Sequence, residues 1–158
     1  MFDQFSERAR IVILLARLSA GHRGAAAIDY EHLVDAILRE DDQKRLPPPF
    51  NDPNISHWKK RRAFFTDETA SEVLSELESV PASGIAIADS ADMPLSVGLG
   101  TTLVEVVTLA AESKHKMVEP LHLLAAVLAK DLPVAEQLRR HGVTLDAVRA
   151  AIESGKFF

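Results

Sequence analysis

The most informative pattern along the chain is a block of apolar and polar positions that occurs twice. Residues 5–41 align without a gap over residues 95–131, an offset of 90 residues. Between the identical positions, apolar character is kept at the spacing of an α-helix, which predicts two copies of one helical unit. The identical pairs are Ser6/Ser96, Ala20/Ala110, His32/His122, Leu33/Leu123, Ala36/Ala126, Leu38/Leu128 and Asp41/Asp131.

Each copy is predicted to form a helix, a short loop and a second helix. In the first copy Ser6 is placed to cap a helix that runs to about residue 20, and Asp29 is placed to cap the next one. In the second copy Pro120 takes the first helical position, where its missing N–H costs nothing. Two more short helices are predicted after the second copy, at 133–140 and 145–154, each followed by a glycine stop.

The middle of the chain gives a weaker pattern. Three consecutive prolines from Pro47 remove backbone donors, which predicts a loop over 43–52. A helix near 53–65 and another over 67–80 are expected, and residues 85–88 and 93–97 suggest a small hairpin. The predicted fold is therefore all-α and a single domain over 1–158. Its parts are a first repeat (1–42), an insert (43–93) and a second repeat (94–154).

Composition supports one ordinary folded domain. The 158 residues are 47% apolar and carry a formal charge of −5, far from the composition of disordered chains. The absence of cysteine excludes a disulfide framework, a thiolate zinc site and a cysteine nucleophile. The longest apolar run, Ile11–Ala16, is much shorter than a membrane span, and no secretory signal pattern opens the chain. A cytoplasmic protein without a membrane partner is therefore expected.

Three segments resemble the N-terminal domain of the Clp (Hsp100) unfoldases. Met1–Arg10 is similar to the family's M-F-x-x-F-[ST]-E-R-A-R opening. Ile28–Leu38 is similar to I-x-[TP]-E-H-L-L-x-A-L-L, and Val118–Leu128 repeats it. Ala135–Arg149 is similar to the closing A-x-x-L-x-x-x-G-V-x-L-x-x-V-R. The resemblance covers about 1–42 and 94–154, so the insert is unexplained by it.

The resemblance implies an all-α domain of two pseudo-symmetric repeats that binds client proteins or adaptors for an ATPase ring. No G-x-x-x-x-G-K-[ST] phosphate loop occurs in the 158 residues, so ATP hydrolysis is not expected. We therefore expect a stand-alone, non-enzymatic protein-binding module without a cofactor. It would act as an adaptor, or regulate proteolysis by a separately encoded Clp chaperone or protease. A monomer is favoured, and no nucleic acid is expected as a partner.

Phe2, Glu31 and His32 are the predicted client contacts, in a shallow, partly apolar groove between the repeats. The resemblance implies that the acidic residue of the E-H-L-L motif receives a basic or phosphoarginine-marked client, which points to Glu31. The second copy has Leu121 at that position, so at most one such site is expected. The alternative is that Glu31 only serves the helix dipole. Phe2 is expected either to cap the core or to line the groove.

Two other functions are possible from the residues. His32 and His122 occupy equivalent positions and suggest a metal-assisted hydrolase, although neither has a cysteine or histidine three or four residues further on. An alternative is that each histidine satisfies a backbone group near a helix start.

The segment 58–65 suggests a nucleic-acid binder, because a run of four basic residues lies there beside aromatic residues. Its alternatives are a solvated helix face and a surface for docking onto an acidic protein. The docking candidates are Trp58, Lys59, Lys60, Arg61 and Arg62. At the other end of the chain, Phe157 and Phe158 follow a glycine stop, which predicts either a frayed tail or a docking tag.

Overall fold

Hydroxyl side chains fix where most of the helices begin. In the computed structural model, Ser6, Thr66, Ser96 and Thr144 each accept a hydrogen bond from the backbone N–H three residues further on. Proline takes the first helical position of two other helices. The helices are α1 (Glu7–His22), α2 (Tyr30–Glu40), α3 (Asp67–Ser79), α4 (Val97–Glu112), α5 (Pro120–Leu128), α6 (Pro133–Arg140) and α7 (Leu145–Ser154).

The structure describes residues 2–52, 54, 62–82, 84–89 and 91–158. These residues form the predicted all-α fold, with a short 3-10 turn at Gln43–Arg45 and no strand. None of the helices in the described ranges is long and apolar enough to cross a membrane. The predicted helix ends at 133–140 and 145–154 agree with α6 and α7 residue for residue.

The two repeats pair through contacts that are repeated at the offset of 90 residues. Phe5 forms a β-bridge with Val118, and Ile28 forms the equivalent bridge with Leu95. The Ser6 hydroxyl donates to Glu119 at 2.9 Å, and the Ser96 hydroxyl donates to Asp29 at the same distance. Each repeat therefore donates a hydrogen bond to the N-cap residue of a helix in the other repeat. Because the contacts are reciprocal, the helix pairs α1–α2 and α4–α5 are related by approximate two-fold symmetry.

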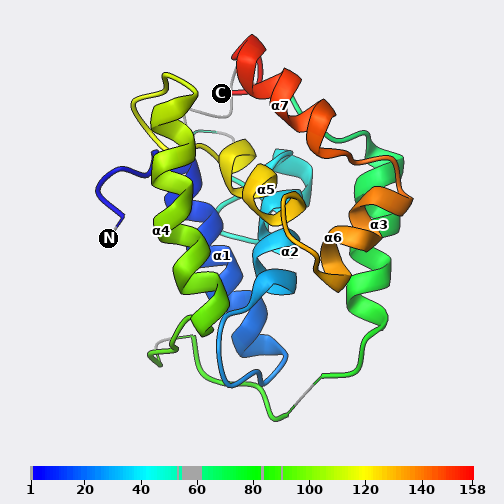
Figure 1. Ribbon diagram of the computed structural model, residues 1–158. Helices are drawn as coiled ribbons and strands as arrows, with labels where there is room; N and C mark the ends of the chain where they lie inside the picture. Colours follow the sequence, from blue (N-terminus) through cyan, green and yellow to red (C-terminus); the bar gives the residue numbers. More distant parts are fainter. Residues whose placement is uncertain (1, 53, 55–61, 83, 90) are drawn as a thin grey trace.

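The hydrophobic core lies where α2 and α5 meet in the middle of the molecule. Leu33 and Leu38 of α2, and Leu123 and Leu124 of α5, have no exposed surface. In Figure 1, α1 and α4 lie on one side of this central pair, and α3, α6 and α7 lie on the other. The helices after each repeat therefore enclose the central pair from the side opposite to α1 and α4.

The insert crosses the end of α1. The N–H of Ile87 donates to the carbonyl of Gly21 at 2.8 Å, and Arg17 Nη2 donates to the carbonyl of Ala88 at 2.8 Å. Gly24 has a φ of +65°, and a Cβ there would lie 2.3 Å from the carbonyl carbon of Gly84. Only glycine permits this close backbone approach.

One prediction for the insert needs correction, and another lies largely outside the described residues. The small hairpin does not form: residues 84–89 run against the end of α1, and Leu95 pairs with Ile28 instead of with residues 85–88. The end of α1 offers these segments backbone partners that a sequence pattern does not reveal. The helix predicted near 53–65 falls largely on residues 53 and 55–61, which lie outside the described residues, and its described end at 62–65 is not helical.

The tail is packed, which corrects the prediction of a frayed end. The Phe157 ring lies 5.4 Å from Phe64, and the Phe158 ring lies 4.7 Å from His115. Gly155 ends α7 in the left-handed conformation, with a φ of +65°, and turns the chain back toward the body. The aromatic rings then find partners that are far away in the sequence.

Candidate functional site

A groove of about 860 Å³ lies on the described surface. Its walls are the second half of α1, the exposed side of α2, the end of α3 and the start of α6, and Pro47 and Pro48 complete them. We call it the acidic groove. Its larger aliphatic side chains come from three separate segments and are Leu15, Leu18, Leu77, Val80, Leu132 and Val134.

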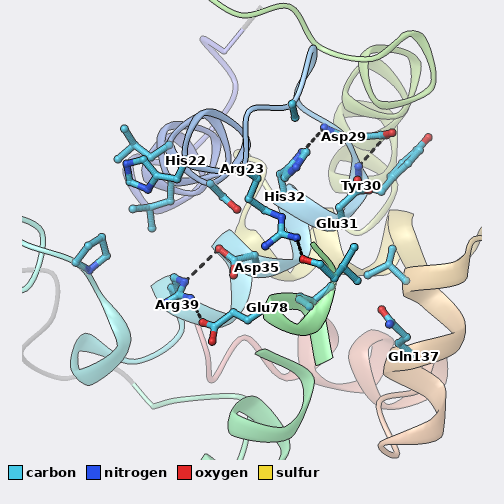
Figure 2. A pocket seen from close by; sticks show the side chains of 18 of the residues that line it. His22, Arg23, Asp29, Tyr30, Glu31, His32, Asp35, Arg39, Glu78 and Gln137 are labelled. Atoms are coloured by element: carbon cyan, nitrogen blue, oxygen red, sulfur yellow. Dashed lines mark hydrogen bonds and ion pairs between the residues drawn. The ribbon is translucent and has the colours of Figure 1, made fainter. Parts of the chain in front are cut away.

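Charged side chains surround this apolar lining, and most of them are negative. Five carboxylates and two arginines line the groove (Figure 2). The carboxylates are Asp29, Glu31, Asp35, Glu78 and Asp89, and the arginines are Arg23 and Arg39. A groove with this excess of carboxylates attracts basic groups.

Glu31 and His32 both lie in the acidic groove, at the first turn of α2. Glu31 is exposed, and its carboxylate adds to the negative side of the groove. His32 is only 4% exposed, and its Nδ1 accepts the backbone N–H of Asp29 at 2.9 Å. Burial lowers the pKa of His32, and the charges of Glu31 and Asp29 oppose that shift. His32 is therefore a neutral capping residue at pH 7, as the alternative interpretation of this histidine expected.

The structure places Phe2 outside the lining of the acidic groove. Its ring packs edge-on against Phe5, with 5.2 Å between the ring centroids, and it lies against the core. Of the predicted docking candidates, Trp58, Lys59, Lys60 and Arg61 fall outside the described residues, and Arg62 is exposed. The structure therefore brings together two of the predicted client contacts, Glu31 and His32, and separates the third from them.

The second histidine uses its ring in the same way. The Nδ1 of His122 accepts the backbone N–H of Glu119 at 2.8 Å, and its Nε2 lies 3.1 Å from His115 Nδ1. Burial, and then the neighbouring His115, lower the pKa of His122 to about 4, so its imidazole is neutral at pH 7. No group of three or more metal-ligating side chains occurs in the part of the chain that the structure describes.

Arg39 joins two walls of the acidic groove, which the sequence analysis missed. Its Nε donates to Asp35 at 3.1 Å on α2, and its Nη2 donates to Glu78 at 2.9 Å on α3 (Figure 2). Two sequence signals were present. Asp35 and Arg39 are four residues apart on one helix face, and their equivalents in the second repeat are Ala125 and Ala129. This loss of both charges in one copy marks the face as specific to the first repeat.

His141 fastens the α3 wall of the groove to the end of α6. Its Nε2 lies 2.6 Å from Glu76 and its Nδ1 lies 3.0 Å from Glu72, both on α3. These hydrogen bonds raise the pKa of His141, with Glu76 as the main cause. The charged form of the imidazole donates to both carboxylates, so protonation holds α3 in place. Arg140, 3.9 Å from Glu76, adds a second positive charge.

This contact predicts a pH-dependent stabilisation. A histidine whose folded pKa is raised contributes its full stabilisation below the unfolded pKa and loses it as pH rises through the folded pKa. We expect His141→Gln to lower the melting temperature at about pH 5.5, and this difference to shrink by about pH 8.5. The other histidines are the same in both proteins, so their contributions cancel in the comparison. In a Glu72→Gln/Glu76→Gln background, His141→Gln should no longer change the melting temperature. If the effect of His141→Gln stays constant or grows at high pH, the ion pairs of His141 with Glu72 and Glu76 are not its cause.

Comparison with known proteins agrees with this fold. Residues 95–155 match the family model described as the Clp repeat (R) N-terminal domain. No curated protein sequence matches the chain. Among solved structures, the N-terminal domain of the chaperone ClpD from Arabidopsis thaliana is similar, with a TM-score of 0.63 and 19% identity. That likeness covers 98% of this chain and 99% of the ClpD chain.

Two further structures are similar over nearly their whole length. The Hsp104 N-terminal domain from Candida albicans has a TM-score of 0.64 and 16% identity, over 95% of this chain and 89% of that chain. A structure from investigations of a malarial protein secretion system has a TM-score of 0.70 and 16% identity, over 96% of this chain and 94% of that chain. At these identities the likeness shows the fold, and the fold is that of a Clp-type N-terminal domain.

Proposed function

We propose that this chain, whose residues 95–155 belong to the Clp repeat N-terminal domain family, binds client polypeptides non-covalently in the acidic groove. The observation that carries the proposal is the composition of that groove. An apolar lining from α1, α3 and α6 lies beside the exposed carboxylate of Glu31. This combination suits an extended segment that carries both apolar and basic side chains.

The groove favours an unfolded client over a folded surface. Its volume of about 860 Å³ accommodates a few side chains, and its lining comes from separate segments of the chain. Apolar side chains of the client would lie against Leu18 and Val80, which are already partly exposed. A basic side chain would face Glu31 and Glu78. Such contacts give modest affinity, because both charges are near the surface and screened.

The second repeat lacks an equivalent acidic groove. The offset of 90 residues places Leu121 at the position of Glu31, and Ala125 at the position of Asp35. Leu121 is only 5% exposed and belongs to the core. The basic client segment is therefore expected to use the first repeat alone, as the sequence analysis anticipated.

The likeness to Clp N-terminal domains suggests where a bound client would be delivered. The chain would deliver bound polypeptides to a Clp-type ATPase, or withhold them from it, and so act as an adaptor or a regulator of proteolysis. The binding step needs no cofactor and no reactive group, so this proposal treats the chain as a non-enzymatic module. Partner choice then depends on the groove and on whichever surface meets the ATPase.

Fluorescence anisotropy tests the binding step. The probe is a fluorescein-labelled peptide of alternating leucine and arginine residues, and an analogue with glutamate in place of arginine is the peptide control. We expect Glu31→Lys to weaken binding of the basic peptide about tenfold, because an attraction becomes a repulsion. Glu112→Lys is the matched control, since it makes the same charge change at an exposed position outside the groove.

Two results would overturn the groove as the client site. One is equal weakening by Glu31→Lys and Glu112→Lys, which would mean that only the net charge of the protein matters. The other is unchanged binding when Val80→Ser removes part of the apolar lining. Binding of the glutamate analogue as tightly as the arginine peptide would contradict the preference for basic clients.

A further inference from the structure

Phe158 packs on the second repeat at a position whose equivalent in the first repeat lines the open acidic groove. In the first repeat, Ala25 and His32 line the acidic groove. Their equivalents, 90 residues later, are His115 and His122. The ring of Phe158 packs against both, with centroid distances of 4.7 and 5.6 Å. One position in the repeat thus faces an open groove in the first copy and holds an aromatic ring in the second.

The tail is anchored by contacts to other parts of the body. The Phe157 ring packs edge-on against Phe64, and the Phe157 carbonyl accepts a hydrogen bond from Arg8 Nη1. The Phe158 ring packs against the two histidine rings, and this residue is 36% exposed. Displacement of Phe158 alone would leave the contacts of Phe157 in place.

A small cavity lies further along α5. It measures about 200 Å³, and its α5 wall is formed by Ala125, Ala126 and Ala129. These alanines lie three, four and seven residues after His122, so they are on the same face of the helix. Where the first repeat has Asp35 and Arg39, the second repeat has Ala125 and Ala129. The α5 wall of the cavity is therefore apolar, while Glu105, Lys130 and Arg149 line it from other segments.

We propose that His115 and His122 form a second binding site, for an aromatic side chain of a partner polypeptide, and that Phe158 occupies it until the partner displaces it. The seated Phe158 identifies the chemistry of the ligand, because its ring already makes an edge-on contact with His115 and a tilted contact with His122, as an incoming aromatic side chain would. The apolar α5 wall of the small cavity takes an apolar residue of the partner. The acidic groove in the first repeat takes no part in this site.

Competition by the tethered tail sets the expected affinities. A segment held close to its site acts at an effective concentration of about 1 mM, which an external peptide must exceed. The probe is a synthetic peptide with the sequence of residues 153–158, and the control peptide has alanine in place of its last phenylalanine. We expect Phe158→Ala to bind the probe at least about tenfold more tightly than the wild type. NMR signals of the His115 and His122 rings should report the binding.

Three results would overturn the proposal. They are equal binding of the probe by both proteins, ring shifts confined to His32, and equal binding of the control peptide. Glu31→Lys in the Phe158→Ala background should leave the probe-induced shifts of the His115 and His122 ring signals unchanged, so failure of this site and failure of the acidic groove are told apart. A wild-type dimer that Phe158→Ala abolishes would assign the site to a second copy of the chain, and would also overturn the proposal.

A second variant keeps the test independent of folding defects in Phe158→Ala. Trp58 is the only tryptophan of the chain, so Phe158→Trp in a Trp58→Phe background places a single fluorophore at the site. We expect the probe in excess to shift the tryptophan emission to longer wavelength, as the ring moves from the histidines into water. An emission maximum that does not respond to the probe while the protein remains folded would count against displacement.

Discussion

Glu40→Ala is expected to lower the free energy of unfolding by about 3–5 kcal/mol. The side chain of Glu40 is fully buried, and that of Arg8 is 10% exposed. Arg8 Nη2 lies 2.7 Å from Glu40 Oε1, and Arg8 Nε donates to the same carboxylate. Removing the carboxylate leaves the buried guanidinium without its main counter-charge, and this desolvated charge causes the loss. For a chain of this size the melting temperature should fall by roughly 6–20 °C.

The double variant Arg8→Met/Glu40→Leu separates this cause from a simple loss of contacts. Replacing both charges by apolar side chains leaves no unpaired ion, so the double variant should be much more stable than Glu40→Ala. Urea unfolding followed by circular dichroism measures the free energy of unfolding of the wild type and of each variant. Glu112→Ala, at an exposed position, should change the stability by less than about 0.5 kcal/mol. A loss below about 1 kcal/mol in Glu40→Ala would show that the pair is not buried as described.

Phe5→Ala is expected to cost about 3–5 kcal/mol of folding free energy. Phe5 has no exposed surface, and its backbone forms the β-bridge with Val118 that joins the two repeats. Its ring also packs against Phe2. Truncation therefore leaves a cavity at the interface between the repeats, where both copies contribute to the wall, so the cavity cannot collapse easily.

Leu95 provides a matched control, because it is the equivalent of Phe5 in the second repeat. It is only half-buried, so Leu95→Ala should cost about 1–2 kcal/mol. Chemical denaturation of the two variants under identical conditions makes the comparison. Equal costs at the two positions would contradict the unequal burial of Phe5 and Leu95. A Phe5→Leu variant should recover most of the loss, since it keeps much of the buried volume.

The helices could be predicted from the sequence because local groups decide where they start and end. Thr144 and Gly155 bracket α7 as expected, since a hydroxyl cap and a left-handed glycine act within one turn. The capping role of His32 could also be anticipated, because its partner, the Asp29 N–H, is three residues away. The duplicated pattern showed in addition that the two helical units would resemble each other.

The acidic groove could be predicted only in part, because its walls come from segments far apart in the chain. Glu31 was recognised through a motif, whereas Glu78 and Leu132 join the site only through the packing of α3 and α6. The path of residues 84–89 depends on backbone partners at the end of α1, and the seat of Phe158 depends on two histidines more than thirty residues before it. Neither arrangement leaves a periodic signal in the sequence.

The two repeats contact each other reciprocally, through Ser6 with Glu119 and Ser96 with Asp29. Reciprocal contacts of this kind are usually found between separate subunits. When one residue of a unit contacts a second residue of its twin, and the reverse contact also exists, the interface is isologous, as in a two-fold homodimer. Here a covalent connection joins the two partners, so they are always present in equal numbers. The connection also frees each partner to diverge, and the present differences between Glu31 and Leu121 are of the kind that a strict homodimer cannot acquire.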